Sequence, residues 1–208
     1  MPVAELKSSS EQTRARLLVA ARTVFSQQGF QGATVREICR RAGANVAAVN
    51  YHFGGKNELF AEALNFSPLR TLQQQNACAD ADPEVRLSLF IESFMRLLLD
   101  ESHASSQCQI MARELADPTP ALDQIVREAI APLHEYLHSL LHEVTARRCT
   151  DERVTLCVNS IVGQCMYYRH AHPVLLRLNP ELRYDAAEIA AIAQHIAAFS
   201  LRGLAALK

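Results

Sequence analysis

The stretch that decides the fold spans residues 34–53 and reads TVREICRRAGANVAAVNYHF. Thr34 and Glu37 form a capping box at the start of a short helix, and Gly43 can end that helix. Asn45 can then cap a second short helix. Two short helices joined by a turn that contains glycine predict a helix-turn-helix, whose second helix lies in the major groove of DNA.

An amphipathic helix precedes this motif, and another helix follows it. Ser8 and Glu11 make a second capping box, and Gly29 ends the helix that they open. The apolar stripe of this first helix consists of Leu17, Leu18, Ala21, Val24 and Phe25. A glycine pair at 54–55 breaks the chain after the motif, before the next helix. The N-terminal part therefore predicts a small group of helices that holds the helix-turn-helix.

The rest of the chain shows little strand-like alternation and predicts further helices. Beyond Pro68 they are expected at about 83–100, 104–115, 119–146, 152–170 and 185–206. Pro68 and Pro132 fall inside helical patterns and are expected to kink them. The predicted fold class is all-α, with a three-helix helix-turn-helix domain over residues 1–56 and a helical effector-binding and dimerisation domain over residues 57–208.

Charge is distributed unevenly along the chain, although the formal net charge is only −1. Residues 1–56 hold eight Lys and Arg against three Glu, whereas the remainder holds 13 basic and 19 acidic residues. A basic end on an acidic body suggests that only this end meets the phosphates of nucleic acid. The six cysteines form no Cys-x-x-Cys pair, and neither a signal peptide nor an apolar run of about 20 residues is visible. A cytoplasmic protein without a membrane partner is therefore expected.

The second helix of the motif carries the expected contacts with operator DNA. Val46 and Val49 are expected to face the core, and the small residues beside them let the backbone approach the bases. Four side chains are expected on phosphate oxygens, namely Thr34, Tyr51, His52 and Lys56. Four others are expected at base edges, namely Arg36, Ala47, Ala48 and Asn50. Asn45 completes the predicted DNA-binding set, and Asn50 is the residue that can pair bidentately with adenine.

These motifs resemble the TetR family of bacterial transcriptional regulators. The resemblance rests on Thr34-Val-Arg-Glu-Ile, Ala42-Gly-Ala-Asn and Val49-Asn-Tyr-His-Phe-Gly-Gly-Lys-Asn-Glu-Leu-Phe. The C-terminal part resembles the CecR-like branch in Arg113-Glu-Leu-Ala-Asp-Pro-Thr-Pro-Ala-Leu-Asp, Ser160-Ile-Val-Gly-Gln-Cys-Met-Tyr-Tyr-Arg and His172-Pro-Val-Leu-Leu-Arg. The resemblance implies a homodimeric repressor that leaves a palindromic operator when a small-molecule effector binds. Activation in place of repression stays open at this point.

A rival signal lies in the segment His134-Glu135-Tyr136-Leu137-His138, which matches the H-E-x-x-H pattern of zinc proteases. Two histidines four residues apart on a helix can bind zinc, and the glutamate can act as a general base. His142 extends the ladder by one turn. The alternative function is therefore a metal-dependent helical enzyme using His134, Glu135 and His138. Pro132 just before the segment and the lack of a recognisable third-ligand motif downstream oppose this alternative.

The expected partners are double-stranded operator DNA, a second copy of the chain and a small-molecule effector. No catalytic residue, cofactor or metal is expected. The helices near 152–170 and 185–206 are expected to pair with their copies in the dimer, with Ile192 and Ile196 at the interface. An effector needs a concave, mostly apolar site with a few polar groups. The predicted lining is Phe94, Met95, Met111, His134 and His138, and solvated surface histidines are the alternative.

Overall fold

The structure is a computed structural model, and it describes residues 3–64, 69, 71–72, 74, 81–99 and 107–207, with only the backbone of residues 3–8 and 107–109. Every regular element in these ranges is a helix, which confirms the all-α fold class. The kink expected at Pro68 lies outside the described residues. The chain divides into two compact units, Met1–Phe66 with Ser105–Arg127 and Ser67–Ala104 with Glu128–Lys208. Within the described ranges, no helix has both the length and the apolar character needed to cross a lipid bilayer.

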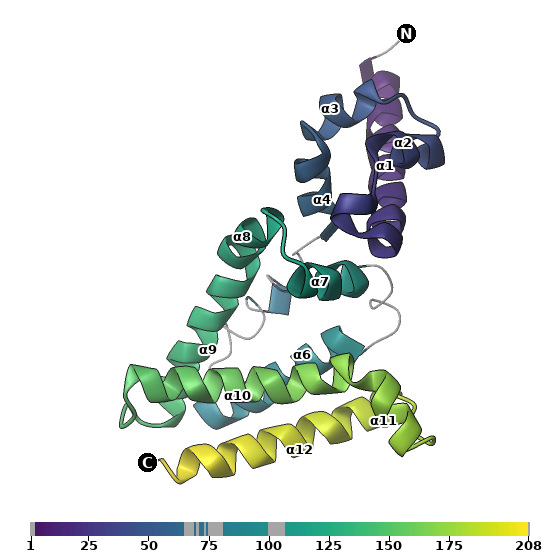
Figure 1. Cartoon of the computed structure of the whole chain (residues 1–208). Coiled ribbons are helices and arrows are strands. Elements are labelled where there is room, and N and C mark those ends of the chain that lie inside the picture. The colour runs from purple at the N-terminus through teal and green to yellow at the C-terminus, as the bar shows by residue number, and fades with distance from the viewer. Residues whose placement is uncertain are drawn as a thin grey trace. The chain divides into compact units, whose positions relative to one another are not determined.

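The first unit contains the helix-turn-helix (Figure 1). Its helices are α1 (Val3–Gly32), α2 (Val35–Ala42), α3 (Ala47–Phe53), α4 (Lys56–Leu64), α7 (Gln107–Ala116) and α8 (Ala121–Ile125). The helix start expected at Ser8 is wrong, because α1 already begins at Val3. The first helix ends at Gly29 as predicted, since this residue has a non-helical φ of 70° and ψ of 179°, and a short helical turn follows it up to Gly32.

Aromatic side chains form the centre of the first unit. Phe25 on α1 meets Phe60 on α4 edge to face, with ring centroids 4.7 Å apart, and the Phe30 ring lies 5.0 Å from that of Phe60. Other buried residues of the predicted stripe are Leu17, Ala21 and Val24. α2, α4 and α7 all pack against α1, so α1 is the central helix of this unit and its buried stripe is part of the unit's core.

The chain returns to the first unit at α7, which packs against α1 and α4. Glu114 on this helix is buried, and one of its carboxylate oxygens accepts hydrogen bonds from the backbone amide and the hydroxyl of Thr119, at 2.7 and 2.8 Å. These bonds close the turn between α7 and α8. The first unit is thus built from two separate stretches of sequence.

The second unit is a helical bundle. It contains α6 (Pro83–Leu99), α9 (Ala131–Val144), α10 (Asp151–His170), α11 (His172–Leu178) and α12 (Ala186–Ala205). In Figure 1, α6 packs against α9, α10 and α12, and α10 also contacts α9 and α12. These helices share one apolar core, whose members include Leu87, Phe90, Leu137, Val158, Ile161 and Ile189. The helices expected at 152–170 and 185–206 are confirmed to within one residue at each end.

The helix expected over residues 119–146 is interrupted. α8 ends at Ile125, a π-helical segment follows at Val126–Ile130, and α9 begins at Ala131. Pro132 is the second residue of α9, and it has no amide to donate back into the preceding turn, which is the π-helical one. The irregularity expected at Pro132 is therefore present, as a wider helical turn just before the proline.

Candidate DNA-binding site

The residues that flank α2 fix both of its ends. The Thr34 hydroxyl accepts a hydrogen bond from the backbone amide of Glu37 at 3.2 Å. Gly43 follows the helix with a φ of 59° and a ψ of 41°, a left-handed conformation that glycine adopts at little cost. Both predicted ends of the helix are confirmed, and the turn after Gly43 leads directly into α3.

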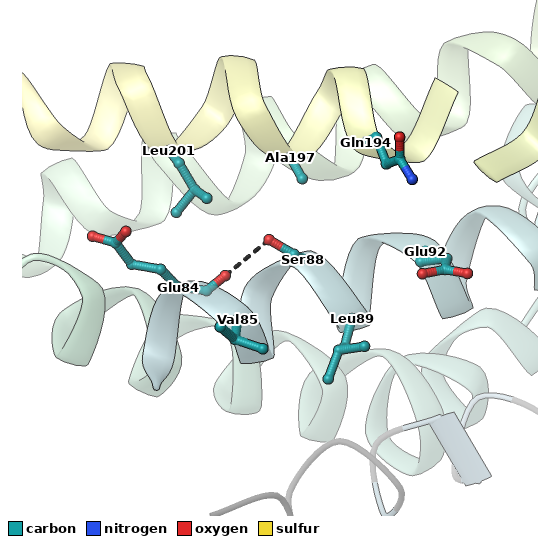
Figure 2. A pocket seen from close by; sticks show the side chains of 8 residues that line it. All are labelled: Glu84, Val85, Ser88, Leu89, Glu92, Gln194, Ala197 and Leu201. Carbon is teal, nitrogen blue, oxygen red and sulfur yellow. Dashed lines mark hydrogen bonds between the residues drawn. The ribbon is translucent and has the colours of Figure 1, made fainter. Parts of the chain in front are cut away.

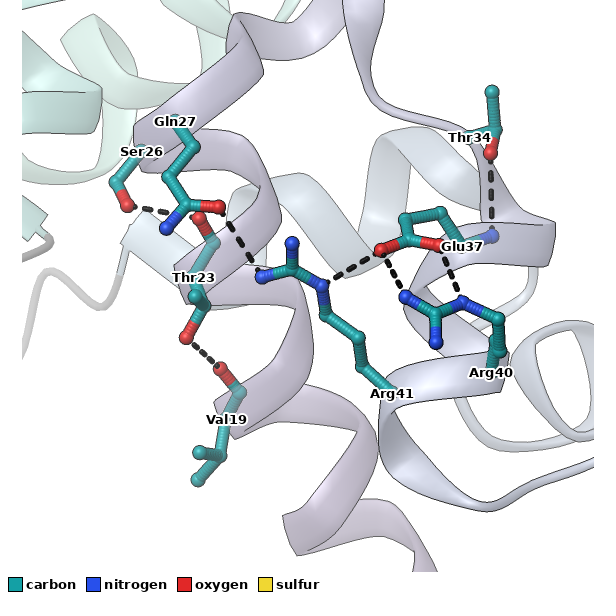
Figure 3. Close-up of polar contacts among 8 residues, drawn as sticks. All are labelled: Val19, Thr23, Ser26, Gln27, Thr34, Glu37, Arg40 and Arg41. Carbon is teal, nitrogen blue, oxygen red and sulfur yellow. Dashed lines mark hydrogen bonds and ion pairs between the residues drawn. The ribbon is translucent and has the colours of Figure 1, made fainter.

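Glu37 uses its carboxylate for the arginines of α2 rather than for the second half of the capping box (Figure 3). The guanidinium of Arg40 donates two bonds to it, at 2.7 and 2.8 Å, and Arg41 donates one at 2.7 Å. Arg41 also donates to the side-chain oxygen of Gln27 on α1 at 3.2 Å. The bonds from Arg40, and then those from Arg41, lower the pKa of Glu37 to about 2. This network joins α2 to α1 and neutralises part of the basic charge of the motif.

α3 turns one side to the core and the other to solvent. It begins after Asn45, whose side-chain oxygen accepts a bond from the amide of Ala47 at 3.0 Å, as expected for a capping residue. Val49 is buried, whereas Ala47 and Asn50 are exposed and Tyr51 is 80% exposed. The solvent side of α3 therefore combines a small residue, an amide and a phenol.

The structure corrects the expectation that Val46 faces the core. Its spacing to Val49 predicts a core residue, but its side chain is 48% exposed. It occupies the position before the first residue of α3, and periodicity is a weak guide to burial at the end of a helix. Val46 is thus an apolar side chain on the candidate DNA-binding surface that the sequence pattern missed.

Two cations near α3 rest on aromatic rings. The Lys56 ammonium lies 4.3 Å from the centroid of the Phe30 ring, and burial lowers the pKa of this amine. The Arg14 guanidinium lies 5.0 Å from the centroid of the Phe53 ring and is paired with Glu62. Such cation–π contacts stabilise a cation against the protein, so Lys56 must leave Phe30 to reach a phosphate.

The structure places all the predicted DNA-contact residues on α2, on α3 or directly beside these helices. Those that are exposed are Thr34, Arg36, Asn45, Ala47, Asn50 and Tyr51. Those that are half-buried are Ala48, His52 and Lys56. The His52 ring packs edge to face on the Tyr51 ring, with centroids 4.9 Å apart. The individual contacts of these residues with phosphates or bases stay predictions.

The structure does not gather the predicted effector-binding residues in one place. Phe94 and Met95 are buried on α6 in the second unit. His134 and His138 are half-buried on α9 in the same unit. Met111 is half-buried on α7 in the first unit. One cavity lies between α6 and α12 and another beside α1, α4 and α7, and neither has any of the five residues in its wall. Their role in effector binding stays a prediction.

The H-E-x-x-H segment lies on α9, where Glu135 is exposed. The His134 and His138 rings stack with their centroids 6.2 Å apart. His138 lies in a group of possible metal ligands with His142 and Asp151, and this group includes neither His134 nor Glu135. Among the described residues, the carboxylate that lies beside His138 and His142 is therefore that of Asp151, and not that of Glu135 from the protease pattern.

A helix-turn-helix with a solvent-facing second helix, followed by a helical bundle, defines the class of helix-turn-helix transcriptional regulators. Residues 17–63 match the family described as bacterial regulatory proteins, tetR family. Residues 83–204 match the family described as HTH-type transcriptional dual regulator CecR, C-terminal domain. The chain belongs to the TetR family of transcriptional regulators and has a C-terminal domain of the CecR type.

Relatives and solved structures resemble the chain over both units. HTH-type transcriptional dual regulator CecR of Shigella flexneri is 26% identical over 178 residues, which cover 80% of this chain and 79% of the relative. A transcriptional regulator from Rhodococcus sp. Rha1 has a crystal structure with 25% identity and a TM-score of 0.63, covering 91% of this chain and 96% of that one. FadR from Bacillus subtilis, in complex with stearoyl-CoA, has a TM-score of 0.66 at 15% identity, covering 91% and 98% of the two chains.

Proposed function

We propose that this protein represses transcription as a homodimer that binds a palindromic operator and releases it when a small-molecule effector binds the second unit. The observation that carries the proposal is the solvent side of α3, where Ala47, Asn50 and Tyr51 are exposed while Val49 holds the helix in the core. A helix with one buried side and one exposed side can enter a major groove with its exposed side while its buried side stays packed against the rest of the unit. Two such helices in a dimer would read half-sites one turn of DNA apart, at about 34 Å.

Base recognition is assigned first to Asn50 and to the start of α3. The Asn50 amide can donate and accept at once, which fits the N6 and N7 atoms of adenine. Val46 and Ala47 supply methyl groups of the kind that contact the 5-methyl group of thymine. Arg36 is exposed on α2, and its guanidinium suits the O6 and N7 atoms of guanine. The exposed Tyr51 hydroxyl is assigned to a phosphate oxygen, to which it would donate.

Fluorescence anisotropy with DNA from upstream of the protein's own gene tests this assignment. Asn50→Ala should weaken binding to the preferred sequence by about 1–3 kcal/mol, roughly 5- to 150-fold, and relax the preference at one base pair. Lys56→Ala should weaken binding to all sequences similarly and reduce the salt slope by about two, because each protomer of the dimer loses one cation. Asn57→Ala, which removes an exposed asparagine from α4, is the matched control and should keep the sequence preference. An unchanged preference in Asn50→Ala would show that the base assignment is wrong.

The dimer is proposed to form through the outer faces of α10 and α12. Large apolar side chains are exposed there, with Leu156 at 59%, Tyr167 at 52% and Phe199 at 63% exposure. Apolar surface of this kind is what obligate dimers bury. Ile196 is buried inside its own protomer at 1% exposure and Ile192 is half-buried, so neither is the best probe of the interface.

The effector is proposed to bind in a groove of about 340 Å³ between α6 and α12 (Figure 2). Its wall consists of Glu84, Val85, Ser88, Leu89, Glu92, Gln194, Ala197 and Leu201. Four apolar side chains and four polar ones, among them Glu84 and Glu92, line this groove, so it suits a small molecule that combines an apolar chain with a polar or cationic group. The FadR structure, which shares the fold, is in complex with stearoyl-CoA, a molecule that has such a chain.

A neutral solvatochromic dye such as Nile red tests the groove without knowledge of the natural effector. Leu89→Asp replaces one of the four apolar side chains of the wall with a carboxylate, beside Glu84 and Glu92, and should weaken dye binding because less apolar surface is left to bury. His134→Ala changes α9 instead and should leave dye binding as it is. The opposite pattern would move the site to the residues predicted from the sequence.

A further inference from the structure

Side chains from two helices of the second unit meet where α9 gives way to α10. The chain reverses after α9 through Ala146 and Arg147, which have positive φ values of 50° and 55°. This reversal brings Asp151, the first residue of α10, beside the C-terminal half of α9. The Nε2 atom of His142 lies 2.9 Å from Oδ1 of Asp151, and Nε2 of His138 lies 3.4 Å from the backbone oxygen of Asp151.

We propose that His138, His142 and Asp151 bind a divalent late first-row transition-metal ion, with zinc as the reference ion. One ligand atom from each residue lies within 4.8 Å of the other two. In a tetrahedral zinc site with metal–ligand bonds of about 2.0–2.1 Å, ligand atoms are about 3.3–3.4 Å apart. The separations within the group run from 2.9 Å up to 4.8 Å and therefore span this value.

The donor set fits this class of ion. Two imidazoles and one carboxylate form zinc sites that keep a fourth position open for water or another ligand. Imidazole ligands also suit nickel and copper. His138 and His142 stand one turn apart on α9 with ring centroids 4.9 Å apart, and the carboxylate comes from the other helix. A bound ion would thus link α9 to α10 across the turn between them.

Access and orientation support the same site. The Asp151 side chain is 86% exposed, so an ion can enter from solvent, whereas the His142 side chain is 14% exposed. The Nδ1 atom of His142 is buried and has no hydrogen-bond partner among the described residues. The contact with Asp151 is therefore the hydrogen bond that orients this ring, and it directs Nε2 toward the carboxylate. An ion bound at Nε2 requires the imidazole proton on Nδ1, so the proton that lies between Nε2 and the carboxylate in the metal-free form would move to Nδ1, or leave to solvent where the ring starts as imidazolium.

The proposed site makes a different prediction from the H-E-x-x-H pattern. That pattern requires His134 as a ligand and Glu135 as a base, whereas the proposed site contains neither residue. The His134 ring stacks on the His138 ring, 6.2 Å away between centroids, without joining the three ligand atoms. His134 is therefore a matched control, because it is the same residue on the same helix one turn from the site.

Calorimetric titration of the full chain with zinc chloride, in a reductant that does not chelate zinc, measures the site. We expect one ion per chain, with affinity at least tenfold lower in His138→Ala, His142→Ala and Asp151→Asn, since loss of even an outer-shell partner costs about 10- to 100-fold. His134→Ala should bind as the wild type does. Asp151→Asn keeps an oxygen that can accept from His142 but loses a negative charge in the first turn of α10, so its melting temperature without metal should fall by only a few degrees at most. Cobalt should show visible bands of a tetrahedral site without the near-ultraviolet bands of thiolate ligation.

Three results would overturn the proposal. The first is a wild-type chain that does not bind zinc, or that binds it no better than His142→Ala and Asp151→Asn do. The second is loss of binding in His134→Ala with retention in His142→Ala, which would assign the ion to the H-E-x-x-H pattern. The third is a cobalt spectrum dominated by thiolate bands, which would assign the ion to the cysteines. None of these results depends on DNA binding, so the repressor proposal is tested separately.

Discussion

Gly43 offers the sharpest test of how the DNA-binding motif is built. It follows α2 with a φ of 59°, and a Cβ atom added there would meet no heavy atom within 4 Å. Gly43→Ala therefore causes no clash, and its effect comes from the backbone conformation. The left-handed conformation costs a residue with a Cβ atom about 1–2 kcal/mol. The smaller entropy of the unfolded alanine chain offsets about 0.4–1 kcal/mol of this. The expected net loss in the free energy of unfolding is about 1 kcal/mol.

Gly203 provides the matched control. It lies inside α12 without a positive φ, and an added Cβ atom would again meet nothing within 4 Å. Gly203→Ala should raise the free energy of unfolding by about 0.5–1 kcal/mol, because alanine is a better helix former than glycine. Within one protomer both substitutions add one methyl group in open space, and Gly203 lies one turn from Phe199 on the proposed dimer face, so the comparison is made with the monomeric Phe199→Asp chain. Opposite signs would then isolate the contribution of the backbone conformation at Gly43.

Scanning calorimetry of the three proteins makes the measurement. A loss of about 1 kcal/mol should lower the Tm of Gly43→Ala by about 2–4 °C in a chain of this size. Gly43→Asn should lose less, because asparagine tolerates the left-handed conformation better than alanine does. A Gly43→Ala protein as stable as the wild type, beside a stabilised Gly203→Ala, would refute the left-handed end of α2 and the turn geometry that depends on it.

Two further predictions concern charge and assembly. The pKa of Glu37 is lowered from 4.5 to about 2, so its ion pairs stabilise the fold fully above about pH 4.5 and lose this effect as the pH falls toward 2. Glu37→Gln should therefore be less stable than the wild type at neutral pH in urea unfolding, and the difference should vanish near pH 2; a difference that does not depend on pH would contradict this. Phe199→Asp alters a side chain that is 63% exposed and should give a folded monomer in analytical ultracentrifugation, whereas Ile196→Asp, at 1% exposure, should unfold the second unit. A wild-type chain that sediments as a monomer would refute the proposed dimer.

The helix-turn-helix is predictable from the sequence because its signals are local. Thr34 caps α2 through a bond to the third residue after it, and Gly43 ends the helix by its own conformation. The buried face of α1 follows from helical spacing, and Pro132 marks the irregular turn before α9. Each of these features depends on residues within one or two turns of each other, which a sequence pattern can report.

The features that escape prediction depend on residues far apart in the chain. Lys56 rests on Phe30, and nothing in the pattern around either residue indicates the pair. The sequence predicts Ile196 at the dimer interface because α12 is apolar around much of its surface. In the structure, however, the Ile196 side chain is buried in the core of its own protomer. Asp151 joins the histidine ladder only because Ala146 and Arg147 reverse the chain in a conformation that neither residue favours. Such contacts require the folded chain.

The pairing of basic side chains leads to a last prediction, on how salt affects operator binding. The eight Lys and Arg of residues 1–56 suggest a binding surface of about eight cations per protomer. In the structure, Arg40 and Arg41 are paired with Glu37, Arg14 with Glu62, and Lys56 lies on Phe30. The guanidinium of Arg22 donates to the backbone oxygen of Ala63. Among the described side chains of α1 and α2, Arg16 and Arg36 are the exposed cations that have no ion pair with a described residue.

With Arg16 and Arg36 free, and Lys56 leaving Phe30 for a phosphate, about two to three cations per protomer meet DNA, so a dimer would neutralise roughly four to six phosphates. The slope of log K against log salt concentration would then be about −4 to −5, whereas eight cations per protomer would give about −14. Amides, hydroxyls and helix N-termini would supply the remaining phosphate contacts, and these release few counterions. Anisotropy titrations between about 50 and 200 mM salt measure this slope, because log K falls linearly with log salt concentration. A slope beyond about −10 would show that the ion pairs of Glu37 and Glu62 open on DNA. It would refute the prediction that Arg14, Arg40 and Arg41 stay paired with these glutamates in the complex.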